Sequence, residues 1–124
     1  IVGMTNKGEQ NIFIGSEGMN PPENPITLTI HNGCGVNGLA AHFQKILARY
    51  QYDVREIGTS SDIYDKTVII DHGKRPSAEI EKLRQLMGVD KGQLIKIERS
   101  GYSTDVKIIL GKDYGSLKIY KSKL

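Results

Sequence analysis

The sequence predicts an α+β domain: a two-layer, ferredoxin-like (split-βαβ) plait with an extra C-terminal strand, whose two helices lie on one face of a mixed sheet. Apolar residues recur at every second position in some segments and at helical spacing in others, and these segments follow the order βαββαβ. The second and third strands are joined by only ~10 residues without a helix, whereas a parallel crossover usually needs about a dozen or more. We therefore expect a hairpin between them, as in a split-βαβ plait.

The first strand and the first helix have the clearest patterns. Ile26, Leu28 and Ile30 alternate with polar residues, which predicts a strand with one buried face. The helix that follows carries its apolar residues on one stripe, at Leu39, Phe43, Ile46, Leu47 and Tyr50.

The later elements show the same periodicities. A second helix is expected to begin near Pro76, which suits a first helical turn, and to stop at Gly88. Leu117 and Ile119 are expected to add an edge strand protected by neighbouring lysines. Further strands are expected over residues 52–57, 66–71, 93–98 and 104–110.

Length and composition indicate one domain after a linker. The 124 residues suffice for a single core, and residues 25–124 are expected to form it. Residues 1–24 are expected to be a linker with a short strand at residues 11–14, because three prolines between positions 20 and 25 restrict the backbone to extended forms. The net charge of +3 suits an anionic partner without requiring nucleic acid, and the single Cys34 excludes an intrachain disulfide.

The turn between the first strand and the first helix matches the dinucleotide-binding pattern GxGxxG at Gly33, Gly35 and Gly38. We reject that reading because the chain is too short for a doubly wound sheet and no crossover helix follows the second strand. The glycines are expected to permit a sharp reversal and close packing, with Asn37 as the N-cap of the helix. A second reading stays open, in which backbone amides around Asn32 and these glycines hold a phosphate or carboxylate.

No residue pattern predicts catalysis, a cofactor or a metal. His31 and His72 are expected at the carboxyl ends of neighbouring parallel strands, near Asp71 and Cys34, but their spacing matches no zinc signature. A nucleophile elbow of the form Gly-x-Ser-x-Gly does not occur in the sequence.

The open sheet face is expected to be polar and faintly basic. It would present Thr27, Thr29 and Lys107, with Lys96 as a further member, as a surface for a glycan or an anionic wall polymer. The central strands at residues 27–31 and 67–71 contain no aromatic residue for base stacking, so we expect no nucleic-acid partner.

Two motifs near the ends of the domain carry a family resemblance. Residues 30–40, Ile-His-Asn-Gly-Cys-Gly-Val-Asn-Gly-Leu-Ala, and residues 105–114, Asp-Val-Lys-Ile-Ile-Leu-Gly-Lys-Asp-Tyr, resemble the LytR C-terminal domain family. The first motif departs from the family's V-x-N-G-[ST]-G-x-x-G-L-A pattern at Cys34, where Ser or Thr is usual. Gln51 also stands where the family usually has a helix-ending glycine.

The resemblance implies an accessory domain without established catalytic residues, commonly found after a LytR-CpsA-Psr phosphotransferase domain outside the cytoplasmic membrane. We therefore expect a non-catalytic cell-envelope module that binds a cell-wall polymer or an envelope protein, with any membrane anchor upstream of this chain. The alternatives are small-anion or nucleotide-phosphate binding at residues 32–38, and a homodimer formed by strand pairing.

Overall fold

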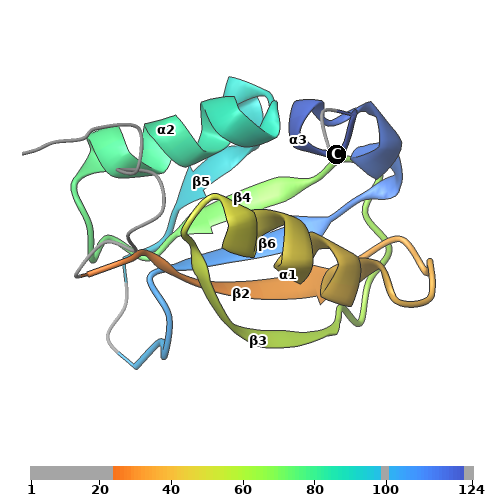
Figure 1. Cartoon of the computed structure of the whole chain (residues 1–124), viewed down its shortest axis with the longest axis horizontal. Helices are drawn as coiled ribbons and strands as arrows, with labels where there is room; N and C mark the ends of the chain where they lie inside the picture. The colour runs from red at the N-terminus through yellow and green to blue at the C-terminus, as the bar shows by residue number, and fades with distance from the viewer. Residues whose placement is uncertain (1–23, 99–100, 122–124) are drawn as a thin grey trace, which may run out of the picture.

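The computed structural model describes residues 24–98 and 101–121, which form a mixed five-stranded sheet with helices packed against it (Figure 1). The strands are β2 (Thr27–Asn32), β3 (Asp53–Thr59), β4 (Val68–Asp71), β5 (Leu94–Lys96) and β6 (Val106–Leu110). The α-helices are α1 (Leu39–Arg49), α2 (Ser77–Met87) and α3 (Lys118–Lys121). Short 3-10 helices occupy Lys91–Gln93 and Lys112–Ser116.

The sheet combines two β-α-β units with one inserted strand, in the order β3-β2-β6-β4-β5. β2 is parallel to β3 across α1, and β4 is parallel to β5 across α2. β6 lies between the two units, parallel to β2 and antiparallel to β4. The last of the five strands in sequence therefore occupies the centre of the sheet.

The expected hairpin between the second and third strands is wrong, and the strand order is not that of a split-βαβ plait. β3 and β4 run antiparallel but are separated by β2 and β6. The segment between them crosses the end of the sheet, where Ser60 N donates to Asn32 O at 3.0 Å and Tyr64 N donates to Gly33 O at 2.7 Å. A loop of this length is too short for a parallel crossover, but it can pass over the ends of two strands because their exposed backbone groups bind it.

Both α1 and α2 cover the same face of the sheet, as expected. The sheet side of the core includes Leu28, Ile30, Ile69 and Ile108, all fully buried. The helices contribute Phe43, Leu47, Ile80, Leu83 and Met87. Each such side chain stabilises the fold by roughly 1.5–3 kcal/mol relative to exposure to water.

The C-terminal segment forms a helix and not the expected edge strand. Leu117 and Ile119 are 3% and 1% exposed and belong to the main core. The 3-10 helix at Lys112–Ser116 turns the chain from β6 back into the helical layer, so α3 lies beside α2 and closes the core there (Figure 1). Burial of these two side chains in the helical layer outweighs the local alternation that predicted a strand.

Helix boundaries follow the predicted signals in α2. Pro76 is its N-cap and Gly88 ends it in a left-handed conformation with φ 81°. The expected linker over residues 1–24 and its strand at 11–14 lie outside the described residues, except for Asn24.

Candidate functional site

The glycine turn between β2 and α1 is held by the side chain of Asn32. Its Oδ1 accepts a hydrogen bond from Cys34 N at 3.1 Å, and its Nδ2 donates to Val36 O at 2.5 Å. Gly35 and Gly38 both have φ 76°, a left-handed conformation that favours glycine. Gly35 and Gly38 therefore allow the chain to reverse direction between β2 and α1, as expected from the sequence.

The start of α1 differs from the expectation at Asn37. Gly38 is the N-cap, and no side chain of the described residues caps this helix. Leu39 N donates to Val36 O at 3.2 Å, so the turn satisfies one of its own amides. A shallow hollow lies beside the turn, and none of its described lining residues is basic: they are Asn32, Gly38, Ala40, Ala41, Ile57, Gly58 and Thr59.

On the sheet face opposite the helices, the hydroxyls of Thr29 and Thr27 both take part in hydrogen bonds within the sheet. Thr29 is only 6% exposed, and its Oγ1 lies 2.7 Å from that of Thr104 and donates to Glu56 at 3.2 Å. Thr27 Oγ1 accepts a hydrogen bond from Asp105 N at 2.9 Å. Thr29 is therefore too buried to belong to an exposed polar platform, whereas Thr27 is half-buried and uses its hydroxyl oxygen as an acceptor within the sheet.

The two lysines expected on that face lie on different sides of the sheet. Lys107 is half-buried on the open face, opposite Thr29 in the register. Lys96 stands opposite Asp71, which pairs with the core residue Val106, so Lys96 lies on the helix side. Burial, followed by the positive charge of Lys107, lowers the pKa of His31 on this face, and Glu56 acts in the opposite direction.

The histidines and their neighbours do not come together. β2 and β4 run antiparallel on either side of β6, so His31 and His72 are not at the ends of neighbouring parallel strands. His72 is buried, with its Nδ1 2.9 Å from Thr104 O and its ring stacked on Tyr102 at 3.7 Å. Within residues 24–98 and 101–121, no group of three or more His, Cys, Asp or Glu residues could hold a metal ion.

The sequence patterns did not predict a groove that lies between the end of α1 and α2. Tyr50, Tyr52 and Lys82 line two hollows of about 340 Å³ and 430 Å³, which join along these shared residues. The first hollow is also lined by Asn24, Pro25, Ile26, Gln51, Arg75 and Glu79. The second is completed by Gln85, Leu86 and Lys118.

The end of α1 places both tyrosines in this groove. Gln51 adopts a left-handed conformation with φ 73°, and Tyr52 N reaches back to Leu47 O at 3.2 Å. Tyr50 was expected in the core but is 42% exposed, whereas Tyr52 is partly buried beside α2. Burial, and then the nearby Glu79 carboxylate, raise the pKa of the Tyr52 hydroxyl. The sequence signals for this groove are Tyr50 and Tyr52, two positions apart, and Gln51 at the place of the family's helix-ending glycine.

The residues that carry the family motifs meet at one place in the fold. Gly33 N donates to Leu110 O at 2.8 Å, which joins the opening motif to the closing one. A Cβ on Gly33 would lie 2.7 Å from the same carbonyl oxygen, so the contact requires glycine. Residues 25–114 match the model of the family described as LytR cell envelope-related transcriptional attenuator. The chain belongs to the LytR C-terminal domain family.

Membership places this LytR C-terminal domain among accessory domains associated with the cell envelope. No curated protein and no solved structure matches the chain. In the part of the chain that the structure describes, no helix is long and apolar enough to cross a membrane.

Proposed function

We propose that this domain is a non-catalytic module of the cell envelope that binds a wall polymer in the groove between α1 and α2. The observation that carries the proposal is that Tyr50, Tyr52 and Lys82 line both hollows of one extended groove. The association of the family with the cell envelope supports a polymer of the wall as the ligand.

The composition of the groove suits a sugar polymer. The exposed part of the Tyr50 ring offers an apolar surface against which the C–H face of a sugar can pack. Gln85 donates through its Nε2 to Glu81 at 2.9 Å, and its side-chain carbonyl can accept a bond from a sugar hydroxyl. Because the two hollows adjoin, several units of a chain could lie along them, and binding by several weak subsites suits a polymer.

A co-sedimentation experiment with purified cell-wall sacculi tests the proposal. The wild-type domain should be retained, Tyr50→Phe should be retained equally, and Tyr50→Leu should be retained several-fold less because it lacks the flat ring. Tyr50 is substantially exposed at the helix end, so these variants should fold normally, which circular dichroism can verify. Failure of the wild-type domain to sediment with sacculi, or equal retention of Tyr50→Leu, would contradict the proposal.

A further inference from the structure

We infer that the groove selects a glycan carrying negative charge, with a sugar ring on Tyr50 and Tyr52 and a phosphate or carboxylate group at Lys82 and Lys118. This inference rests on the proposed function and adds the chemistry of the ligand and its orientation. It follows from the way charge changes along the groove.

At the end near Pro25, the positive charge is matched by nearby acids. The Arg75 side chain is 11% exposed, and its Nε lies 3.2 Å from Asp105 Oδ2 and 3.8 Å from Glu79 Oε1. Glu79 itself lines this hollow, and Lys82, which borders both hollows, is the further charged residue of its described lining. An anionic group placed here would meet a carboxylate and an arginine that is already paired, so this end favours a neutral part of the ligand.

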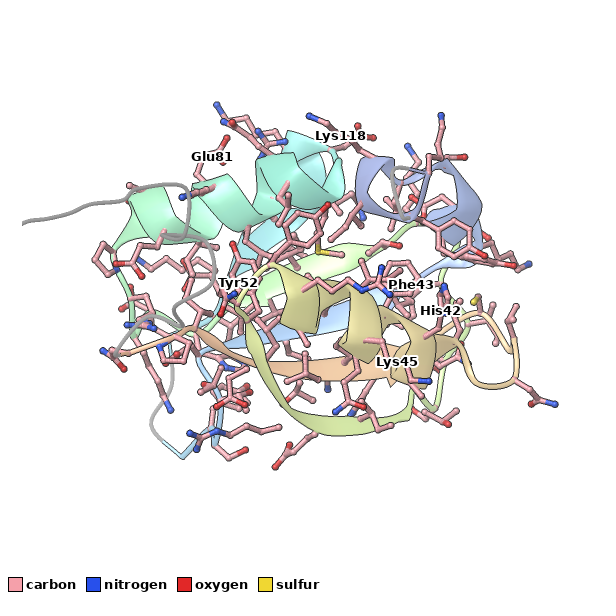
Figure 2. All side chains as sticks on the ribbon, in the orientation of Figure 1. His42, Phe43, Lys45, Tyr52, Glu81 and Lys118 are labelled. Atoms are coloured by element: carbon pink, nitrogen blue, oxygen red, sulfur yellow. The ribbon has the colours of Figure 1, made fainter. Side chains whose placement is uncertain are left out.

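At the end near α3, the lining residues that the structure describes carry positive charge and include no acid. Lys82 and Lys118 line the second hollow, together with the neutral Gln85 and Leu86. Lys118 begins α3 beside the end of α2, where a Cβ on Gly88 would lie 2.7 Å from its Cβ (Figure 2). The nearby acid on α2, Glu81, is engaged by Arg84, whose Nε donates to it at 2.9 Å. The lysine pair therefore favours an anion at this end.

The two tyrosines lie between these ends and define the spacing of the ligand. Tyr50 and Tyr52 border both hollows, and Tyr52 lies at the turn between α1 and β3 (Figure 2). A sugar packed on these rings would place an acidic substituent or a linking phosphate at the lysines. A bare anion would use only the lysines and a neutral glycan only the rings, so each should bind more weakly than a ligand with both parts.

A titration followed by NMR with soluble probes tests this chemistry. The probes are dextran as a neutral glycan, polygalacturonate as a carboxylate glycan, dextran phosphate as a phosphate glycan, and polyphosphate as an anion without sugar. We expect at least one anionic glycan to bind at least about tenfold more tightly than both dextran and polyphosphate, with shifts at the amides of Tyr52, Lys82 and Lys118. The tighter of the two anionic glycans identifies whether the acid is a carboxylate or a phosphate.

Charge-reversal variants provide the matched comparison. Lys82→Glu together with Lys118→Glu should weaken binding of the preferred anionic glycan by about tenfold or more, since two attractive contacts become repulsive. Lys45→Glu makes the same change at an exposed position of α1 that lies outside the groove lining and points away from α2, and it should leave binding unchanged (Figure 2).

The outcomes separate this inference from the proposed function. If dextran binds as tightly as the anionic glycans and sacculi still retain the domain, the charge preference is overturned while the polymer-binding function stands. If polyphosphate binds as tightly as the anionic glycans, or the double lysine variant binds like the wild type, the combined sugar-and-anion site is overturned. If neither sacculi nor any soluble glycan binds, both the proposed function and this inference fail.

Discussion

Asp113 accepts two hydrogen bonds from Thr67 through one oxygen, Oδ1, which lies 2.9 Å from Thr67 N and 2.7 Å from Thr67 Oγ1. Thr67 is fully buried just before β4, and its Oγ1 in turn accepts a hydrogen bond from Gly111 N at 3.0 Å. Gly111 and Asp113 of the closing family motif therefore hold Thr67, the residue just before β4, which lies 44 and 46 positions earlier in the chain. The motif is structural in this domain.

The first prediction concerns this anchor. Asp113→Ala removes a charged acceptor from two donors of Thr67, and hydrogen bonds to charged groups contribute about 1.5–3 kcal/mol each. We expect the free energy of unfolding in urea to fall by about 2–3 kcal/mol. Asp65→Ala removes an acid whose side chain is 91% exposed, and should change it by less than about 0.5 kcal/mol. Similar losses in the two variants would contradict the anchoring role.

The second prediction concerns the close approach of Gly111 to the chain before β4. A Cβ at this position would lie 2.4 Å from the carbonyl carbon of Lys66 and 2.7 Å from Thr67 N, so the backbone would have to move. Gly111→Ala should destabilise the domain by about 2 kcal/mol or more, as measured by chemical denaturation. Gly115→Ala is the control, because its Cβ would meet nothing within 4 Å, and it should be neutral or slightly stabilising.

The third prediction concerns Gln51, the only described residue other than glycine with a positive φ. A left-handed conformation costs a residue with a Cβ about 1–2 kcal/mol, which glycine avoids at some cost in chain entropy. Gln51→Gly should therefore raise the free energy of unfolding by about 1 kcal/mol. Ala48→Gly, at an exposed position inside α1, should lower the free energy of unfolding by about the same amount. If urea melts show that both glycine variants stabilise the domain, or that both destabilise it, the explanation is contradicted.

The fourth prediction concerns the pH dependence of His31. Its pKa is lowered in the folded domain, chiefly by burial and then by Lys107. The unfolded chain therefore takes up the proton more readily, so His31 makes stability fall as the pH drops through 6.5 towards the folded pKa. Above pH 6.5 this loss is absent.

Variants of the neighbouring charges test the cause of that shift. Lys107→Met should raise the pKa of His31 in an NMR titration and reduce the loss of stability between pH 8 and pH 5, without abolishing it because burial remains. Glu56→Gln should lower the pKa further, since Glu56 favours the charged imidazole. Lys45→Met is the control. Lys45 is exposed on α1, which covers the sheet face opposite to that of His31, so this change should leave the titration of His31 unchanged. A pKa that rises in Glu56→Gln would contradict the electrostatic account.

Local patterns in the sequence predicted the features that depend on neighbouring residues. The apolar stripe of α1 is buried at Leu39, Phe43, Ile46 and Leu47, and the end of α2 lies at Gly88. The motifs at residues 30–40 and 105–114 also identified the family. Within them, Gly33 and Gly111 lie so close to neighbouring backbone that no side chain would fit. The sequence marked Gln51 only as a departure from the family's helix-ending glycine, and the structure shows that this position has a left-handed backbone with φ 73°.

The features that the sequence did not predict depend on partners far along the chain. Thr29 looked like a solvent-facing strand residue, but its hydroxyl meets Thr104, 75 positions away. The tyrosines at the end of α1 form a groove only because α2 packs beside them and brings Lys82 into the same lining.

By itself, then, the sequence determined which segments become strands and helices through most of the domain, which of their faces are buried, and the family. The tertiary structure alone decided that β6 separates the two β-α-β units, that the C-terminal segment closes the core as α3, and that the groove exists. The physical reason is that the spacing of apolar residues within a segment shows which of its side chains face the core and which face water. Strand order and side-chain partners depend instead on which arrangement of all the segments buries the most apolar surface. That arrangement is a property of the whole chain and not of any one segment.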